Sequence, residues 1–89
     1  MDDLKATPLH WAAYSGRTEA IKALVALSAS INATDDQKST SLHWAAYAGH
    51  TEAIKVLVAL GAAVNATDDH KATPLHAAAY QGHLSLIHI

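Results

Sequence analysis

Residues 7–13 read Thr-Pro-Leu-His-Trp-Ala-Ala, and nearly the same heptapeptide occurs twice more in the chain. It returns as Thr-Ser-Leu-His-Trp-Ala-Ala at residues 40–46 and as Thr-Pro-Leu-His-Ala-Ala-Ala at residues 73–79. The offset is 33 residues both times, since 40 − 7 and 73 − 40 both equal 33. Residues 2–34 and 35–67 are identical at 24 of 33 positions. A period of this length predicts a stack of similar structural units.

Each unit has the sequence features of two short helices followed by a polar turn. Thr7 is a suitable N-cap, and Pro8 fits the first helical position, where its missing N–H costs nothing. Gly16 is expected to end this helix and Thr18 to cap the next one. The buried face of the second helix is expected to hold Ala20, Ile21, Leu24, Val25 and Leu27. Residues 32–38 are polar and predict a turn or hairpin. Because one helix pair cannot bury these faces alone, the units are expected to stack as a solenoid.

The heptapeptide, the 33-residue period and the helix-turn-helix pattern resemble the ankyrin repeat, and the resemblance covers nearly the whole chain. It implies an all-α ankyrin-repeat solenoid of about two and a half repeats, forming one domain over residues 1–89. Repeat 1 would span residues 2–34, repeat 2 residues 35–67, and a partial repeat 3 residues 68–89. Three features depart from the family, one of them being that Trp11 and Trp44 stand where a smaller aliphatic residue is usual. Lysines stand where the family has a turn glycine, at Lys5, Lys38 and Lys71, and Ser41 replaces the proline. Because lysine adopts a positive φ less easily than glycine, we expect a loosened or different turn.

Residues 84–89, Leu-Ser-Leu-Ile-His-Ile, break the otherwise close agreement between repeats. One set of codons for them, CTG TCT CTT ATA CAC ATC, is similar to a transposase adapter used in preparing DNA-sequencing libraries. We hypothesise that this hexapeptide is a translated sequencing-adapter artefact and that the natural protein continues differently after His83. The alternative is ordinary divergence of a terminal repeat.

Composition and charge exclude several classes of protein. The chain has 6 basic and 8 acidic residues, a net charge of −2, and no cluster of Lys and Arg, so we expect no nucleic-acid partner. It has no cysteine, which rules out disulfides and cysteine-based zinc sites. The acidic start lacks a secretory signal, and no apolar run is long enough to cross a bilayer. We therefore expect an intracellular, cytoplasmic protein without a membrane partner.

The recurring histidines and aspartates could suggest metal or acid–base chemistry. His10, His43 and His76 would lie one repeat apart, about 10 Å for packed helices, whereas zinc ligands lie about 2 Å from the metal. The ankyrin resemblance implies instead that these histidines hydrogen-bond near the threonine cap and tie neighbouring loops. The aspartate pairs fall in polar turns, where Asp favours bonds to the local backbone. We therefore expect no catalytic residue, metal, cofactor or small-molecule substrate.

By resemblance, a partner would dock on the concave side, which the hairpin tips and the first helices form. The matching positions at the hairpins are Leu4, Gln37, His70, Ala6, Ser39 and Ala72. Those on the helices are Tyr14, Tyr47, Tyr80, Ser15, Ala48, Gln81, Trp11 and Trp44. We expect the tyrosines to be exposed as an aromatic ladder, because Tyr is enriched at binding hot spots, and the tryptophans to be partly packed. The alternative is that these aromatic side chains only pack between repeats.

These features predict a monomeric protein-interaction module that binds another protein without catalysis. Two alternatives stay open. The repeats could be the targeting or regulatory arm of a longer multidomain enzyme, or they could form a structural spacer.

Overall fold

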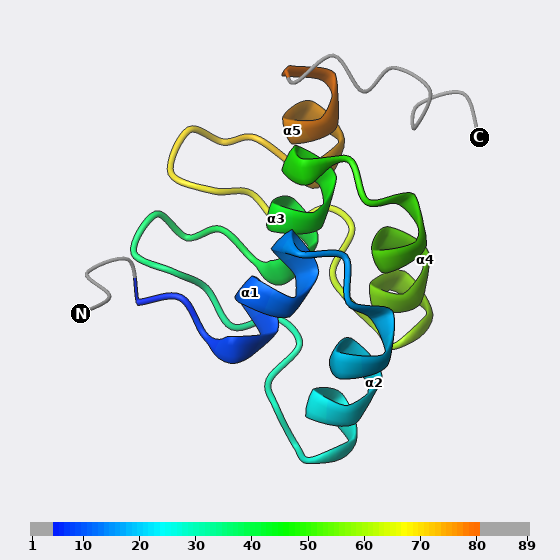
Figure 1. The fold of residues 1–89 in the computed structure, drawn as a ribbon. Coiled ribbons are helices and arrows are strands. Elements are labelled where there is room, and N and C mark those ends of the chain that lie inside the picture. Colours follow the sequence, from blue (N-terminus) through cyan, green and yellow to red (C-terminus); the bar gives the residue numbers. More distant parts are fainter. Residues whose placement is uncertain (1–4, 81–89) are drawn as a thin grey trace.

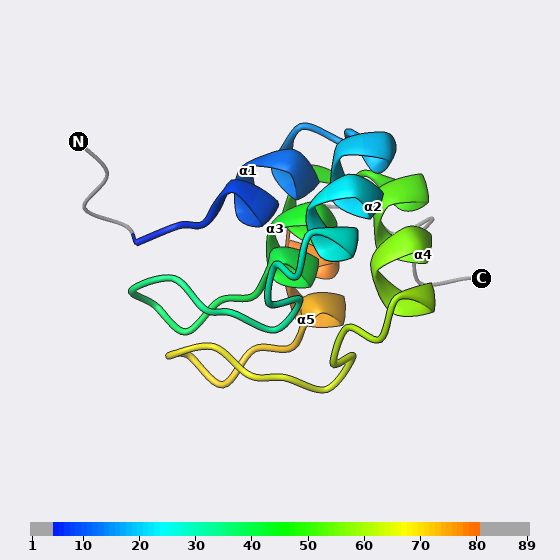
Figure 2. The ribbon, with the colours of Figure 1, turned by 90° about the horizontal axis from the view of Figure 1, so that it is seen from below.

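The computed structural model describes residues 5–80, which form five helices and no strand. They are α1 (Pro8–Tyr14), α2 (Thr18–Ala26), α3 (Ser41–Ala48), α4 (Thr51–Ala59) and α5 (Pro74–Tyr80). Figure 1 shows two layers, with α1, α3 and α5 stacked in one and α2 and α4 beside them in the other. Two long loops, between α2 and α3 and between α4 and α5, extend to one side of the first layer (Figure 2). The predicted all-α solenoid is confirmed.

The first helix of each unit begins at the predicted threonine cap. Thr7 and Thr40 have extended backbones, and their side chains accept hydrogen bonds of 3.3 Å from the N–H groups of His10 and His43. These bonds satisfy donors that the first turn of a helix leaves without partners. Gly16 follows α1 with a φ of 70°, in the left-handed region that favours glycine.

The second helix of each unit begins differently from the prediction. Thr18 and Thr51 are the first residues of α2 and α4, so Thr18 is not a cap. The N-cap is Arg17, whose carbonyl accepts the first helical bond from Ile21 at 3.0 Å, and no side chain caps it. The reason is the tight turn after Gly16, in which the N–H of Arg17 bonds back to Ala12 at 3.0 Å. This turn places the helix start at the threonine itself, one residue earlier than predicted, and the cap at the residue before it.

The core lies between the two layers. It is built from small alanines of the first helices and larger aliphatic residues of the second ones, and Leu9, Ile21 and Leu57 are fully buried. Ala13 and Ala45 are also fully buried and allow α1 and α3 to pack closely. Burial of each large aliphatic side chain stabilises the fold by about 1.5–3 kcal/mol. The apolar periodicity therefore identified Ile21 as buried and Ala20, Leu24 and Val25 as partly buried. The expected burial of Leu27 is wrong, because this residue caps the end of α2 beyond its last turn and is 79% exposed.

The recurring histidines connect one repeat to the next. His10 Nδ1 accepts from the backbone N–H of Thr7 at 3.0 Å, so Nε2 carries the proton and donates to the carbonyl of Ser39 at 2.8 Å. His43 makes the same bonds, with Thr40 at 3.1 Å and the carbonyl of Ala72 at 2.8 Å. Both rings are buried. The structural role that the ankyrin resemblance implied is confirmed for His10 and His43, each of which fixes the following loop against its own first helix.

The lysines keep the backbone conformation that glycine adopts more easily. Lys5, Lys38 and Lys71 have φ values of 61°, 63° and 62°. Around Lys38, the Asp35 carboxylate holds both sides of the turn by accepting from the N–H groups of Gln37 and Ser39, each at 2.9 Å. These bonds offset the cost of the left-handed conformation, which is about 1–2 kcal/mol for an L-residue. The expected change of turn type is therefore wrong for this loop.

Candidate functional site

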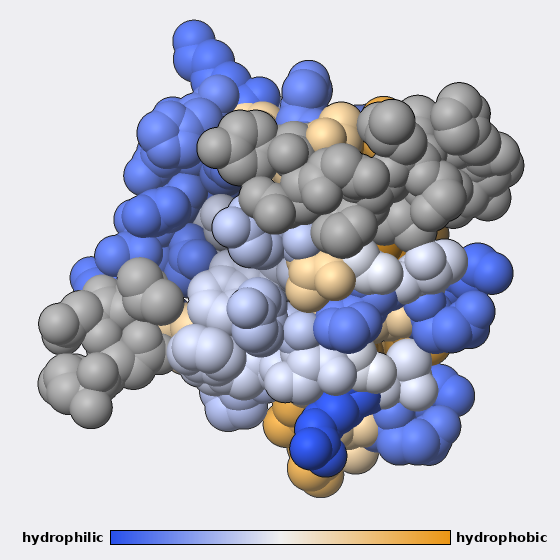
Figure 3. Space-filling model, turned by 45° about the horizontal axis from the view of Figure 1, so that its top comes forward, coloured by the Kyte–Doolittle hydropathy of each residue, from blue (hydrophilic) through white to orange (hydrophobic). Residues whose placement is uncertain are grey.

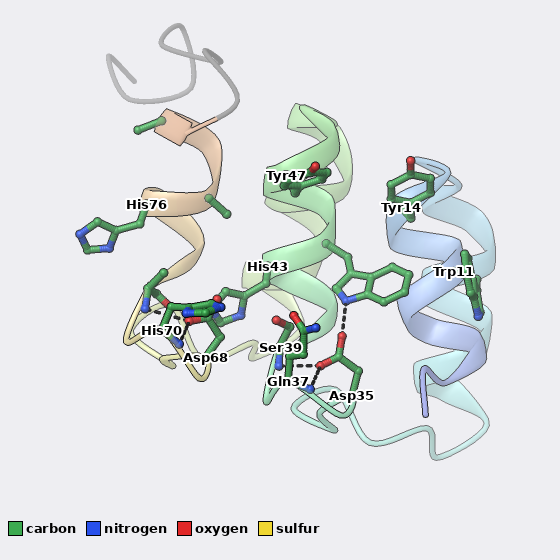
Figure 4. Close-up of a pocket in the computed structure, with 14 residues that line it drawn as sticks. Trp11, Tyr14, Asp35, Gln37, Ser39, His43, Tyr47, Asp68, His70 and His76 are labelled. Carbon is green, nitrogen blue, oxygen red and sulfur yellow. Dashed lines mark hydrogen bonds between the residues drawn. The ribbon is translucent and has the colours of Figure 1, made fainter. Parts of the chain in front are cut away.

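An open groove of about 1080 Å³ lies between the first helices and the two long loops. Figure 4 shows its side chains projecting from α1, α3 and α5 above and from the loops below. In Figure 3 the hydrophilic side chains of the loops gather along one side, beside a paler area of intermediate hydropathy over the first helices. The groove is lined by Trp11, Tyr14, Asp35, Gln37, Ser39, His43, Trp44, Tyr47, Asp68, His70, Ala72, His76, Ala77 and Ala79.

The helix side of the groove is aromatic. Trp44 lies at the centre and meets Trp11 and Tyr14 edge to face, with ring centroids 4.9 Å and 6.0 Å away. The rings of Trp11 and Tyr14 lie 6.4 Å apart in the same arrangement. Such pairs contribute about 0.5–1.5 kcal/mol each beyond the area they bury. The cluster therefore presents aromatic surface in a fixed orientation.

The loop side of the groove is polar and is organised by two aspartates. Besides its two backbone bonds, Asp35 accepts a hydrogen bond from the indole Nε1 of Trp44 at 2.9 Å, which appears as a dashed line in Figure 4. Asp68 repeats the backbone part of this pattern, accepting from His70 at 2.8 Å and Ala72 at 2.9 Å. The prediction that the aspartates serve turn chemistry is confirmed for both, and Asp35 also orients the central ring of the groove.

The pKa of Asp68 lies below its ordinary value of 3.8. Partial burial raises this pKa, but the hydrogen bonds from the backbone N–H groups of Ala72 and His70 lower it, with a smaller contribution from the imidazoles of His43 and His70. The net effect favours the carboxylate. The loop side of the groove therefore carries a fixed negative charge near neutral pH.

The structure brings together eight of the residues predicted for the site. The groove includes Trp11, Tyr14, Gln37, Ser39, Trp44, Tyr47, His70 and Ala72. Ala6, Ser15 and Ala48 lie elsewhere in the described part of the chain and do not line it. Leu4, Gln81 and the side chain of Tyr80 lie outside the described residues, as does the hexapeptide 84–89.

The predicted states of the aromatic side chains are confirmed where the structure describes them. Tyr14 and Tyr47 are 46% and 48% exposed. Trp44 is partly buried, whereas Trp11 is 46% exposed and packs with one edge against its neighbours. The aromatic side chains therefore combine the two alternatives, exposure on the binding face and packing between repeats, because the rings pack on one another and still leave exposed surface in the groove. Their role in binding stays a prediction.

Sequence reasoning missed the pairing of Asp35 with Trp44. The signal that could have found it is the recurrence of an aspartate nine residues before a tryptophan, at Asp2 and Trp11 and again at Asp35 and Trp44. Sequence reasoning also omitted His43 and His76 from the groove, although they contribute to its lining.

The described residues contain no group of three or more His, Cys, Asp or Glu side chains that could hold a metal ion. None of the helices described is long and apolar enough to span a membrane.

Comparison with known proteins adds one finding. The family model described as ankyrin repeats (3 copies) matches residues 9–89 of the chain. A search of curated proteins gives no match.

Proposed function

Because the chain belongs to the ankyrin repeat family, whose repeats generally serve as protein–protein interaction modules, we propose that it binds a partner protein in the groove between the first helices and the loops. In this proposal the groove positions the partner and carries out no chemistry. The observation that carries it is the set of exposed aromatic rings held in the groove, of which Tyr14 and Tyr47 are nearly half exposed.

Exposed aromatic rings of this kind suit protein binding. Tyr and Trp are enriched among the residues that dominate binding energy, because they bury a large area and lose few rotamers. Trp11, Tyr14 and Trp44 already hold one another edge to face, so binding would not need to order them. A preordered surface loses less entropy on association and therefore binds more tightly for the same contact area.

The loop side supplies the polar rim that protein interfaces commonly have. Gln37 and His70 are exposed at the tips of the two loops. These tips are held together by a backbone hydrogen bond of 2.9 Å from the N–H of Asp69 to the carbonyl of Gln37. The two loop tips are therefore linked to each other, and a partner in the groove would meet this polar rim beside the aromatic side.

The test is quantitative capture of partner proteins by the immobilised chain, with two double variants compared. Tyr14→Ala with Tyr47→Ala removes the exposed rings of the groove. Leu27→Ala with Leu60→Ala is the matched control, since these residues are also 33 positions apart, apolar and exposed, at 79% and 38%, but do not line the groove. We expect the tyrosine variant to lose at least tenfold in capture, corresponding to about 1.4 kcal/mol, and the leucine variant to match the parent.

Equal capture by the parent and the tyrosine variant would contradict the proposal. The two alternatives also give distinct outcomes. If the chain is a structural spacer, neither double variant should change the amount of any protein that is captured. If the chain is the targeting arm of an enzyme, the groove still binds a partner, and the catalytic domain would be found in the parent gene.

A further inference from the structure

The groove contains a second copy of the Trp44 site in which the tryptophan is missing. Trp44 is surrounded by His10, Trp11, Tyr14 and Asp35. Adding the 33-residue period to each of these positions gives His43, Trp44, Tyr47 and Asp68 around position 77. All four line the groove, but position 77 is alanine rather than tryptophan. We call the space bounded by these four residues and Ala77 the Ala77 slot.

The occupied copy shows what the slot is shaped to hold. The indole of Trp44 meets the imidazole of His10 edge to face, with ring centroids 5.1 Å apart, and it meets Trp11 in the same way. Its Nε1–H donates to the free oxygen of Asp35, whose other oxygen is used by the turn. An indole therefore satisfies the aromatic walls and the carboxylate at once.

Among the described residues, the copy at Ala77 keeps the same chemistry available. Asp68 Oδ1 accepts from His70 and Ala72, as the Asp35 Oδ1 accepts from its own turn. No described residue donates to Asp68 Oδ2, which is the oxygen that corresponds to the acceptor of Trp44. Figure 4 shows Asp68 beside His70 at the loop, below the space between His43 and His76. A carboxylate held in this way is a strong acceptor for an N–H donor.

We propose that the Ala77 slot receives the side chain of a tryptophan from the partner protein, in the position that Trp44 occupies one repeat earlier. The partner's indole N–H donates to Asp68 Oδ2, and its ring lies against Trp44 and the imidazole of His43. A phenylalanine could fill the space but could not donate to Asp68, and the slot would then leave a partly buried carboxylate oxygen without a partner. This proposal deepens the proposed function and rests on it, since it names the anchoring residue of the bound protein.

The first test uses N-acetyl-L-tryptophanamide as the probe, titrated into the 89-residue chain and followed by two-dimensional ¹H–¹⁵N NMR. We expect saturable shifts at Trp44, Asp68 and Ala77, with a dissociation constant on the order of millimolar for so small a ligand. N-acetyl-L-phenylalaninamide should bind about tenfold more weakly, because it lacks the donor. Equal binding of the two probes, or shifts confined to another surface, would overturn the proposal.

Two variants and a control locate the binding. Asp68→Asn keeps an oxygen for the two turn bonds but replaces the second acceptor by a donor, so the tryptophan probe should bind about tenfold more weakly. Asp69→Asn makes the same charge change at an exposed neighbour that does not line the groove, and binding should stay within about twofold of the parent. Equal losses of probe affinity in both variants would show a general effect of charge and would contradict binding in the Ala77 slot.

A second readout needs no ligand. In Ala77→Trp the chain supplies its own indole, which should fill the slot, abolish probe binding and place its Nε1–H on Asp68. That indole N–H should exchange with solvent at least tenfold more slowly than in the double variant Ala77→Trp with Asp68→Asn. Equal exchange rates in the two variants would contradict a hydrogen bond between the indole at position 77 and Asp68.

If the probe fails to bind while partner capture still depends on Tyr14 and Tyr47, the proposal for the Ala77 slot is wrong and the proposed function stands. If capture is independent of the tyrosines, the proposed function itself fails.

Discussion

Ser41 is the position at which one substitution should stabilise the fold most clearly. It is the first residue of α3, and its hydroxyl is buried without a hydrogen-bond partner among the described residues. The corresponding residues of the flanking repeats are Pro8 and Pro74. Thr40, which precedes it, has a φ of −93° and a ψ of 172°, the extended conformation that proline imposes on its predecessor. The change Ser41→Pro should therefore fit the existing backbone.

The expected gain has two sources. Removing a buried hydroxyl without a partner recovers about 1–3 kcal/mol. Replacing a flexible residue by proline where the native backbone already accepts it adds about 0.4–1 kcal/mol through the unfolded chain. The first helical position needs no N–H, so no hydrogen bond is lost. Allowing for imperfect packing of the ring, we expect Ser41→Pro to raise the free energy of unfolding by about 2 kcal/mol.

The assay is urea unfolding of the 89-residue chain followed by circular dichroism, with thermal unfolding beside it. For a domain of this size a gain of 2 kcal/mol corresponds to a rise of about 10 °C in Tm. Ser41→Ala is the control, because it removes the hydroxyl and leaves the backbone free, and it should give about half of the gain. A parent more stable than both variants would refute the reasoning, since it would mean that the Ser41 hydroxyl has a partner.

Three further substitutions test other parts of the structure. His43→Ala removes a buried ring that joins two repeats and should cost about 3 kcal/mol in urea unfolding. The ring of His76 is exposed and, among the described residues, bonds to its own cap alone, so His76→Ala should cost about 1 kcal/mol. Equal costs of the two substitutions would contradict the bridging role of His43. Lys38→Gly relieves a positive φ of 63° and should stabilise by about 1 kcal/mol, and a destabilised variant would show that the turn is not strained. Asp68 has a lowered pKa in the folded state, so its contribution to stability is present above the ordinary value of 3.8 and is lost as the pH falls through the lower folded-state value. Between neutral and strongly acidic pH, the free energy of unfolding should therefore fall more for the parent than for Asp68→Asn. If it falls equally for both, the lowered pKa of Asp68 is contradicted.

The fold could be predicted from the sequence because its main features are local and periodic. The cap at Thr7 and the glycine at Gly16 have a direct physical meaning and recur in three copies, and the apolar spacing of the second helix recurs in the first two. The start of α2 could not be predicted in the same way. It depends on how tightly the chain turns after Gly16, and that turn leaves Arg17 rather than the threonine at the cap.

The site was less accessible to sequence reasoning. The positions of Tyr14, Tyr47 and Trp44 in the groove follow from the repeat, but the hydrogen bond between Trp44 and Asp35 joins a loop to a helix and depends on the three-dimensional path of that loop. The lysine turns show the same limitation. Propensity disfavours a positive φ at Lys38, and only the backbone bonds that the Asp35 side chain accepts explain why the turn persists.

Site-specific photo-cross-linking tests most directly whether the groove is the surface that binds protein. The photoreactive residue p-benzoylphenylalanine would replace Tyr47, which lines the groove, or Leu60, which is also exposed but lies outside it. Each chain would be irradiated with the same mixture of proteins and its adducts quantified. We predict discrete adducts from position 47 and background labelling from position 60. Equal labelling from the two positions, or discrete adducts from position 60 alone, would contradict the groove as the binding surface.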